Sequence, residues 1–361
     1  MKVISKPTLI VDKSKVLSNI ENMSRKAKET GVLFRPHFKT HQSAEIGELF
    51  RDFDIQSITV SSVDMAIYFA ENGWNDITIA FSANILQWKE IDNLASKINL
   101  NILVENVDVI EFLEKNLNNQ IGVFIKIDSG YFRTGIDVDD YEKVENVMKQ
   151  LEKCKKLIFK GFLTHAGHTY SAKNKDSVIE IAKTAMNKMI ALKSHFKSYN
   201  NCLQLSWGDT PSCSLLDDFS GFDEIRPGNF VFYDEMQVAL GSCCLENIAV
   251  VMACPVVATH SNRNEIVIYG GAIHLSKEYI LHSNIPHYGR VIEYNSYLEN
   301  KPKTIGYVTS LSQEHGIIKI NAPEIKIKSG EIVIVSPVHS CLMVDLAKNR
   351  GGFNFFNYQE L

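Results

Sequence analysis

Eight short apolar segments, with helical patterns between them, constrain the fold of this chain more than any other feature. One clear helical pattern runs from Lys175 to Lys197 with apolar residues at steps of three and four, and another from Ser14 to Thr30 stops at Gly31. Eight strands that alternate with helices are typical of a (β/α)8 barrel. A doubly wound open sheet is the alternative, but no Gly-x-Gly-x-x-Gly follows the first strand. The expected strands are Leu33–Phe38, Ser57–Val60, Asp76–Phe81, Asn101–Val104, Ile121–Asp128, Leu157–His165, Leu203–Trp207 and Glu224–Arg226.

The pattern changes after about Met236, where long helical periodicity ends and short strand-like segments are separated by turns. These segments are Pro255–His260, Glu265–Ala272, Lys303–Ser310, Gly316–Ile320 and Glu331–Val335. We therefore expect a barrel over residues 8–236 and a C-terminal β-rich domain over residues 237–361, which residues 1–7 could join. No low-complexity linker separates the two.

Composition excludes several classes of function. The 361 residues carry a net charge of -4, which gives no electrostatic basis for binding nucleic acid or an acidic membrane. No apolar segment reaches the roughly 20 residues that cross a bilayer. The first seven residues lack the apolar core of a signal peptide, and seven is an odd number of cysteines. We expect reduced thiols and a cytoplasmic location.

The segment Arg35-Pro36-His37-Phe38-Lys39-Thr40-His41 places a lysine at the end of the first expected strand, with two histidines and an arginine nearby. Neighbouring cations and a dry environment both lower the pKa of a lysine. A lysine that titrates near neutrality can form a Schiff base with an aldehyde cofactor. The alternative is an ordinary basic surface loop. In a barrel, however, the loops after the strands build the active site, and this lysine lies in such a loop.

The loops after the seventh and eighth strands contain Thr210, Ser212, Gly228 and Asn229. In barrels these two loops often hold a phosphate through backbone N–H groups and a helix N-terminus. Small residues allow the phosphate to approach the backbone, and hydroxyl groups donate to it. The alternative is that Gly208-Asp209-Thr210-Pro211-Ser212 only caps a short helix over Ser214–Phe219. One electrophilic lysine and one phosphate site in a barrel suggest pyridoxal phosphate.

With these motifs the chain resembles the fold-type III pyridoxal phosphate enzymes, which have alanine racemase-like barrels, and among them the D-serine dehydratase / D-threonine aldolase family. The likeness covers nearly the whole chain. The motifs that carry it occur in order: Arg35-Pro36-His37-x-Lys39-Thr40-His41, Asp128-x-Gly130-x-x-Arg133-Thr134-Gly135, His165-Ala166-Gly167-x-x-Tyr170, Gly208-x-Thr210-Pro211-Ser212 and Arg226-Pro227-Gly228.

Two segments of the second domain, Ser312–Gly316 and Pro337–Leu342, also resemble signatures of this family. His339 and Cys341 are two residues apart, so in an extended strand their side chains would point the same way. An imidazole and a thiolate can bind Zn²⁺ and leave positions open for water or substrate. The resemblance implies a divalent metal, most simply Zn²⁺, on this pair. It also favours dehydration, because the aldolases carry an aspartate at the position of Cys341.

The resemblance implies that Lys39 holds the cofactor and removes the α-proton of a D-amino acid. It further implies that Arg133 binds the phenolic oxygen of the cofactor, with His165 and Tyr170 lining the ring. We see no acid at the seventh or eighth strand that pairs with the ring nitrogen, so the β-hydroxyl group has to leave promptly, with help from the metal. D-Serine or D-3-hydroxyaspartate would then give a keto acid and ammonia.

Four alternatives remain open at this stage. A retro-aldol cleavage of D-threonine-type substrates uses the same lysine and metal. A racemase needs a second base, for which Tyr269 and Tyr288 are candidates. A non-catalytic pyridoxal phosphate carrier would need only the barrel, and a barrel for another phosphate ligand would leave Lys39 without a role. The resemblance also implies a homodimer.

Overall fold

The computed structural model describes residues 4–199, 202–282, 284–321, 326–348 and 354–356, and the chain divides into two compact units. One unit is Glu21–Gly228, named here the barrel unit. The other, named the sheet unit, combines Met1–Ile20 with Asn229–Leu361. The domain boundary expected after residue 236 falls inside the sheet unit as defined in this way.

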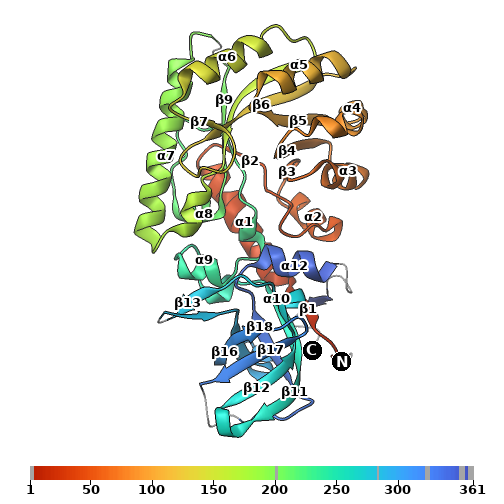
Figure 1. Cartoon of the computed structure of the whole chain (residues 1–361), viewed down its shortest axis with the longest axis vertical. Helices are drawn as coiled ribbons and strands as arrows, with labels where there is room; N and C mark the ends of the chain where they lie inside the picture. The colour runs from red at the N-terminus through yellow and green to blue at the C-terminus, as the bar shows by residue number, and fades with distance from the viewer. Residues whose placement is uncertain (1–3, 200–201, 283, 322–325, 349–353, 357–361) are drawn as a thin grey trace. The chain divides into compact units, whose positions relative to one another are not determined.

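The barrel unit has the predicted architecture. Its main sheet is parallel, in the strand order β2-β10-β9-β8-β6-β5-β4-β3, and the short β7 (Ile136–Asp137) pairs with β6. Helices α2 to α7 lie outside these strands (Figure 1). All eight predicted strands are present: β2 Leu33–Phe34, β3 Ser57–Val60, β4 Asp76–Ser82, β5 Asn99–Val104, β6 Ile121–Asp128, β8 Leu157–Thr164, β9 Gln204–Trp207 and β10 Glu224–Ile225. The (β/α)8 prediction is confirmed, and the open doubly wound sheet is wrong.

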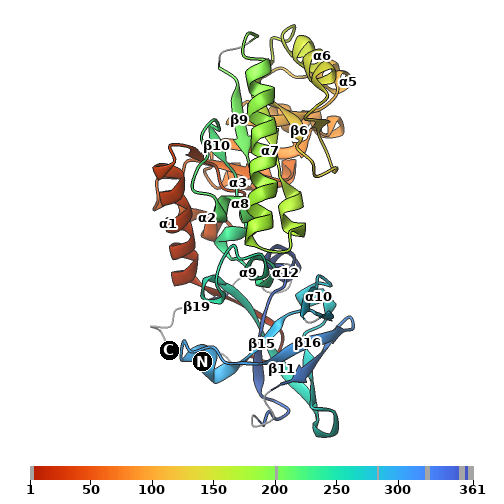
Figure 2. The ribbon, with the colours of Figure 1, turned by 90° about the vertical axis from the view of Figure 1, so that its left-hand side faces the viewer.

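The helices follow their sequence signals. The long helix α7 begins after Asn174, whose side chain accepts a hydrogen bond from the N–H of Ser177 at 2.9 Å, and buries an apolar stripe that includes Val178 and Met189. Figure 2 shows α7 from the side. The helices are α1 Lys13–Glu29, α2 Ala44–Arg51, α3 Val63–Glu71, α4 Trp88–Ala95, α5 Val107–Asn116, α6 Tyr141–Leu151, α7 Lys175–His195 and α8 Thr210–Leu215, with the 3-10 turns η1 Ile85–Gln87 and η2 Gly167–Ser171.

The first strand is shorter than expected because of Pro36. Regular pairing ends at Phe34, since a proline has no N–H group for the ladder. The chain nevertheless stays extended. The N–H of His37 donates to the carbonyl of Pro227 at 2.9 Å, and the N–H of Phe38 donates to that of Thr59 at 2.8 Å. This segment therefore closes the barrel between β10 and β3.

The sheet unit is built on an antiparallel sheet. Its strands follow the order β12-β17-β16-β15-β18-β11-β1-β19, and β12 also pairs with β11, so six of them close into a small barrel. Figure 2 shows its strands β11, β15 and β16. Strand β1 pairs with β11, so the N-terminal strand joins this sheet. The strands are β1 Thr8–Asp12, β11 Val250–His260, β12 Glu265–Tyr269, β15 Arg290–Glu293, β16 Thr304–Leu311, β17 His315–Ile320, β18 Ile332–Ser336 and β19 Asn354–Phe356.

The remaining elements of the sheet unit are short. A separate hairpin is formed by β13 Ile280–His282 and β14 Ile285–His287. The helices are α9 Glu235–Ala239, α10 Ala272–Leu275, α11 Tyr294–Leu298 and α12 Ser340–Lys348, with the 3-10 turns η3 Asn229–Val231, η4 Leu245–Asn247 and η5 Ser261–Arg263. All seven cysteines are free thiols. Among the described residues, no helix has both the length and the apolar character needed to span a bilayer.

Candidate functional site

Lys39 lies just beyond the carboxyl end of the first barrel strand, as predicted. Its side chain is half-buried, and its backbone N–H donates to Nδ1 of His37 at 3.3 Å. The two histidines of the motif have different surroundings. His37 lies beside Lys39, whereas the ring of His41 packs among Phe38, Phe50 and Phe69 in the core. Only His37 can therefore act on the lysine directly.

His165 lies across the barrel mouth from this segment and is held in one tautomer. Its Nδ1 is 2.8 Å from the carbonyl oxygen of Gly208, and since a carbonyl can only accept, Nδ1 carries the proton. Burial, together with the neighbouring charge of Lys39, lowers the pKa values of both His37 and His165 well below 6.5. Both rings are therefore neutral at physiological pH, and Nε2 of His165 is an acceptor.

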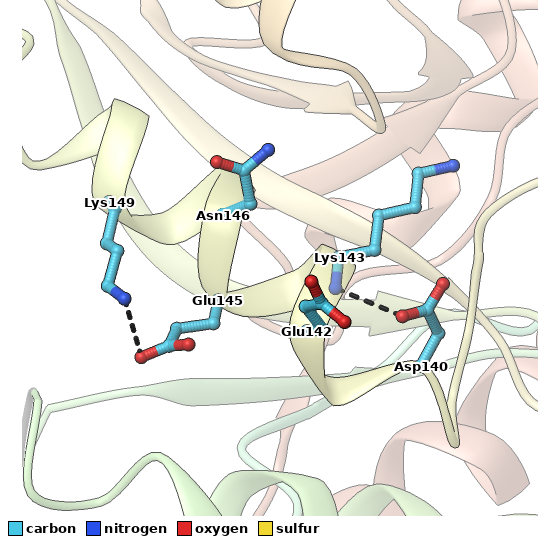
Figure 3. Close-up of a pocket in the computed structure, with 6 residues that line it drawn as sticks. All are labelled: Asp140, Glu142, Lys143, Glu145, Asn146 and Lys149. Atoms are coloured by element: carbon cyan, nitrogen blue, oxygen red, sulfur yellow. Dashed lines mark hydrogen bonds and ion pairs between the residues drawn. The ribbon is translucent and has the colours of Figure 1, made fainter.

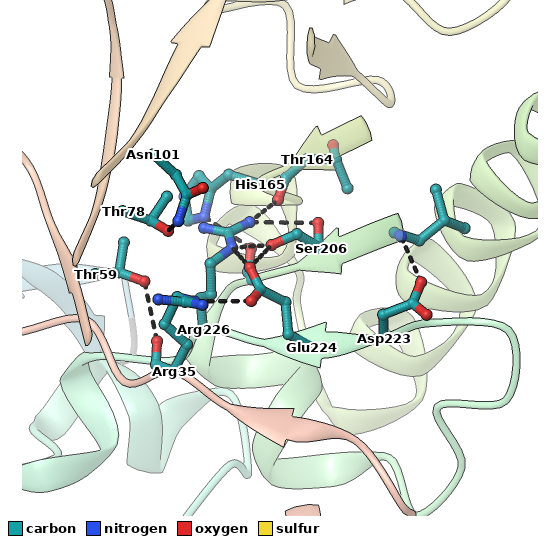
Figure 4. Close-up of polar contacts among 12 residues, drawn as sticks. Arg35, Thr59, Thr78, Asn101, Thr164, His165, Ser206, Asp223, Glu224 and Arg226 are labelled. Carbon is teal, nitrogen blue, oxygen red and sulfur yellow. Dashed lines mark hydrogen bonds and ion pairs between the residues drawn. The ribbon is translucent and has the colours of Figure 1, made fainter. Parts of the chain in front are cut away.

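Arg226 is a buried cation that the sequence interpretation did not assign to the site. Its Nε donates to the hydroxyl of Ser206, and its Nη2 donates to the carbonyl of Thr164 at 2.5 Å (Figure 4). Burial lowers its pKa to about 10, against the opposing effect of Glu224, so the group stays charged at neutral pH. Arg226 is part of the motif Arg226-Pro227-Gly228, but the sequence analysis used this motif only as evidence of the family resemblance.

Lys126 is a second buried lysine, on strand β6, that the sequence interpretation also missed. Its Nζ donates to the carbonyl of Ile127 at 2.9 Å. Burial and the charge of Arg226 lower its pKa to about 8. Lys39, Arg133, Lys126 and Arg226 all act electrostatically on His165. The mouth of the barrel thus collects positive charge.

The predicted phosphate loops meet at the start of α8. This helix begins at Thr210, four residues earlier than predicted from Ser214, and Asp209 is its N-cap. The N–H of Gly228 donates to the hydroxyl of Thr210 at 3.2 Å, and the N–H of Thr210 points to the hydroxyl of Tyr170 at 3.3 Å. Thr210, Tyr170 and Gly228 are therefore brought together.

Ser212 lies in the same turn, but its hydroxyl group already has partners. It donates to Asp209 at 2.6 Å and accepts from Nε1 of Trp207 at 2.8 Å. A phosphate contact from Ser212 would have to replace the first of these bonds. The capping interpretation therefore accounts for this hydroxyl, and its predicted contact with a cofactor stays a prediction.

Arg133 follows strand β6 in an exposed loop organised by Asp128. The carboxylate of Asp128 accepts the N–H groups of Gly130, Tyr131 and Arg133 at 2.8, 2.7 and 3.0 Å. The guanidinium of Arg133 lies 4.8 Å from the ring centre of Tyr131, over its face. The ring of Tyr131 in turn lies 5.9 Å from that of His165. The loop thus aligns Arg133 with the mouth of the barrel.

The charges and shape of the barrel mouth fit pyridoxal phosphate, which carries an anionic phosphate and a phenolic oxygen. Four cations surround His165, and a Cβ atom on Gly228 would lie 2.8 Å from the carbonyl oxygen of His37. Only a glycine allows the backbone to come this close to the Lys39 segment. The donor set is also suitable, because amide, hydroxyl and guanidinium groups all bind phosphate.

His339, Cys341 and Asn229 belong to the sheet unit. The expectation of an extended strand at His339 and Cys341 is wrong, because helix α12 begins at Ser340. The two side chains are nevertheless hydrogen-bonded to each other. Burial lowers the pKa of His339, but Cys341 and the buried Asp234 outweigh it and raise that pKa to about 9. The amide of Asn229 donates to Asp234 at 2.6 Å and to Ser340 at 3.0 Å.

An imidazole and a thiol that lie within hydrogen-bonding reach of each other suit a Zn²⁺ ion. Within the described part of the chain, no group of three histidine, cysteine or acidic side chains is arranged to hold a metal. A metal on His339 and Cys341 would therefore need water or substrate as its other ligands. Asn229 belongs to the sheet unit, and its contact with a cofactor also stays a prediction.

A hollow on the outer face of α6 is unrelated to these residues. It is lined by six polar or charged side chains, and Glu145 and Lys149 form an ion pair of 2.9 Å across one turn (Figure 3). Such pairs on an exposed helix face contribute little beyond solubility.

Comparison with known proteins shows the family of this chain. Residues 11–235 match the family model "Alanine racemase, N-terminal domain", and residues 249–349 match "Putative serine dehydratase domain". The D-serine dehydratase of Dictyostelium discoideum is 30% identical over 299 residues, which are 76% of this chain and 74% of that protein.

Three solved structures share the fold. D-threo-3-hydroxyaspartate dehydratase from Delftia sp. HT23 has a TM-score of 0.90 at 21% identity and covers 98% of this chain and 95% of its own. A cysteine-to-alanine mutant of D-threo-3-hydroxyaspartate dehydratase in the metal-free form gives 0.88 at 22% identity, with coverages of 95% and 93%. D-threonine aldolase from Filomicrobium marinum gives 0.81 at 18% identity, with coverages of 94% and 91%.

Proposed function

We propose that this chain, which belongs to the family of the alanine racemase N-terminal domain, is a pyridoxal-phosphate- and metal-dependent lyase of β-hydroxy D-amino acids. Its main reaction would be loss of water from D-serine or D-3-hydroxyaspartate, which gives a keto acid and ammonia. One observation carries this proposal. Lys39 lies at the barrel mouth beside a neutral histidine, His37, where the other nearby cations favour an anionic cofactor.

Bound pyridoxal phosphate would act as an electron sink for charge that develops at the α-carbon of the substrate. Lys39 would hold the cofactor and, once released, take the α-proton. Positive neighbours keep the amine of a lysine partly unprotonated, as a proton acceptor requires. His165, as a neutral acceptor, would line the ring with Tyr170, and Arg133 would donate to the phenolic oxygen.

The phosphate would be held by the turn that joins Thr210 to Gly228, with Ser212 and Asn229 as further candidates. The N–H of Gly228 and the hydroxyl of Thr210 already form a bonded pair. A phosphate oxygen could accept from this pair, and α8 would present its N-terminus. Because α8 has only six residues, the charge of the surrounding cations contributes more than the helix does.

A divalent ion on His339 and Cys341 would supply Lewis acidity at a hydroxyl oxygen of the substrate. The pair fits this role because an imidazole and a thiolate are both Zn²⁺ ligands, and Asp234 stabilises positive charge beside them. One solved structure of a related dehydratase is a mutant in the metal-free form, which supports metal binding by that relative.

Cleavage of D-threonine to glycine and acetaldehyde is the second candidate, since D-threonine aldolase shares the fold. Cys341 favours dehydration, because the resemblance gives the aldolases an aspartate there. A racemase would need Tyr269 or Tyr288 as its second base. Tyr269 lies 5.5 Å from the ring of His274, and Tyr288 lies 6.2 Å from that of Tyr279.

The test is a product assay. Purified protein with pyridoxal phosphate and Zn²⁺ is incubated with D-serine, D-threonine and D-threo-3-hydroxyaspartate, and keto acid, ammonia, glycine, aldehyde and L-enantiomer are measured. We expect keto acid and ammonia in equal amounts. Glycine with aldehyde would favour the aldolase, and no turnover of any substrate would contradict a lyase. Lys39→Ala should lower the rate by about a thousandfold or more, whereas Lys89→Ala, on the exposed face of α4, should not.

Two further properties belong to this proposal. We infer a homodimer from the family resemblance, which light scattering of the purified protein would test. The seven free thiols fit a reducing compartment such as the cytoplasm.

A further inference from the structure

We propose that Ser206 and Glu224 are positioning residues that hold the guanidinium of Arg226 toward the cofactor site, an inference that rests on the proposed function. These residues come from neighbouring strands, β9 and β10, and their side chains point into the barrel (Figure 4). The network that they form links two motifs that the sequence interpretation treated separately. One motif contains Arg35 and Lys39, and the other contains Arg226 and Gly228.

The first step is the direction of the hydrogen bonds at Ser206. Its Oγ lies 2.6 Å from Oε1 of Glu224 and also within hydrogen-bond distance of Nε of Arg226. A carboxylate can only accept and a guanidinium can only donate. The hydroxyl proton of Ser206 therefore points to Glu224, and its lone pair receives Arg226. Ser206 can fill this role in one orientation only.

The second step is the charge of Glu224. Its other oxygen, Oε2, accepts from Nε of Arg35 at 2.8 Å, and Arg35 also reaches Asp76 at 2.6 Å. The side chain of Glu224 is only 5% exposed. A buried carboxylate costs free energy unless it is paired. Arg35 supplies such a partner for Glu224, and Glu224 in turn lies 3.9 Å from Nε of Arg226.

The third step is what remains free on Arg226. Nε and Nη2 are used by Ser206 and Thr164, whereas Nη1 has no hydrogen-bond partner among the described residues. A Cβ atom on Gly208 would lie 3.1 Å from Nη1, so the absence of a side chain leaves this nitrogen open. The same Gly208 receives Nδ1 of His165. Nη1 is therefore the available donor beside the ring-lining histidine.

These contacts convert a long, flexible side chain into a fixed donor. A free arginine would lose rotamer entropy when it binds a ligand, and the network removes that cost before the ligand arrives. The side chain of Ser206 is bonded to Arg226 and Glu224, whereas Glu224 also pairs with Arg35. We therefore expect the effect of Ser206 on the cofactor to pass through Arg226, which distinguishes positioning from general support of the barrel.

The test measures the affinity of the protein for pyridoxal phosphate by quenching of tryptophan fluorescence, and the visible absorbance of the bound cofactor against pH. The variants are Ser206→Ala, Glu224→Gln and the matched control Asp223→Asn. Asp223 is the neighbour of Glu224 in the chain, but its carboxylate binds Lys193 and the N–H of Leu205 and makes no contact with Arg226 among the described residues. Ser206→Ala and Glu224→Gln should each weaken cofactor binding by about tenfold and shift the titration of the absorbance, as expected when a charge-assisted hydrogen bond is lost. Asp223→Asn should change neither by more than about twofold.

The decisive comparison uses Arg226→Lys, because lysine lacks the forked donor. In that background, Ser206→Ala should change cofactor affinity by less than about twofold, whereas a merely structural role would again give about tenfold. An additive effect would overturn the inference, as would wild-type affinity and titration in both single variants. If one variant does not fold, as judged by circular dichroism, the other completes the comparison. Failure of the wild-type protein to bind pyridoxal phosphate would instead contradict the proposed function.

Discussion

Nδ1 of His165 lies 2.8 Å from the carbonyl oxygen of Gly208, in the turn that also faces Arg226. This bond fixes the tautomer of the ring that we assign to the cofactor site. His168, three residues later, is a natural control, because its buried Nδ1 has no hydrogen-bond partner within the described ranges.

The first prediction compares these two histidines. His165→Phe should lower the free energy of unfolding by about 1 kcal/mol, because the carbonyl of Gly208 loses the imidazole donor and keeps only the N–H of Ala166. It should also weaken pyridoxal phosphate binding. His168→Phe should be close to neutral, since no hydrogen bond is lost. Urea denaturation and a fluorescence titration measure both effects, and equal losses in the two variants would refute the role of this bond.

The second prediction concerns Gly228. In Gly228→Ala the new Cβ atom would lie 2.8 Å from the carbonyl oxygen of His37, a backbone atom that cannot move independently of the Lys39 segment. We expect cofactor affinity to fall by at least about tenfold. The size follows from misplacing one well-oriented group in a site. Wild-type affinity in a folded Gly228→Ala protein would show that this approach is not needed.

The third prediction is a pH dependence of stability. Burial among aromatic rings lowers the pKa of His41 to about 3. Below about pH 6.5 the unfolded chain therefore binds a proton at this residue, whereas the folded chain does not bind it until the pH approaches 3. The contribution of the neutral His41 ring to the free energy of unfolding is complete above pH 6.5. It is lost as the pH falls toward 3, by about 1.4 kcal/mol per pH unit.

His41→Phe should remove the part of the pH dependence of the unfolding free energy that His41 causes between about pH 6 and pH 4. The parts that His37 and His165 cause should remain. Urea midpoints at several pH values measure it. The control is His260→Gln, at the end of β11, which should leave the slope unchanged. An identical slope in His41→Phe and the wild-type protein would contradict the assignment of a buried neutral ring.

The overall architecture was predictable, because each barrel strand is a short apolar segment bounded by polar turns. What failed was local. Pro36 ended the first strand early, and the pair His339 and Cys341 was expected in a strand although a helix begins between them. The helix has its own signal, since Met343, Val344 and Ala347 are buried at helical spacing.

The roles of the missed site residues could not be assigned from local patterns, although Arg226 lies in a motif. Arg226 donates to Thr164, 62 positions away in the chain, and the pKa of Lys126 is lowered by its burial and by the charge of Arg226. A buried charge is recognisable only once its neighbours are known. Asp209 likewise lies in one of the motifs, but only the fold shows that its carboxylate accepts a hydrogen bond from the hydroxyl of Ser212.

The fourth prediction is that a chelator stops turnover but leaves pyridoxal phosphate bound. His339 and Cys341 belong to the sheet unit, whereas the residues assigned to the cofactor belong, apart from Asn229, to the barrel unit. Elemental analysis should find about one divalent ion per chain in the wild-type protein and a clear loss in Cys341→Ala. Cys202→Ala, at an exposed thiol, should keep the metal. Full activity in a protein that is free of metal would exclude the Lewis-acid role.

The most direct measurement of the account locates the cofactor on the chain. The protein loaded with pyridoxal phosphate is reduced with borohydride and digested, and the labelled peptide is identified by mass spectrometry. We predict one pyridoxyl group per chain, on Lys39, and no visible cofactor band in Lys39→Ala. A label on Lys126, or a protein that remains unlabelled after loading, would contradict the central claim.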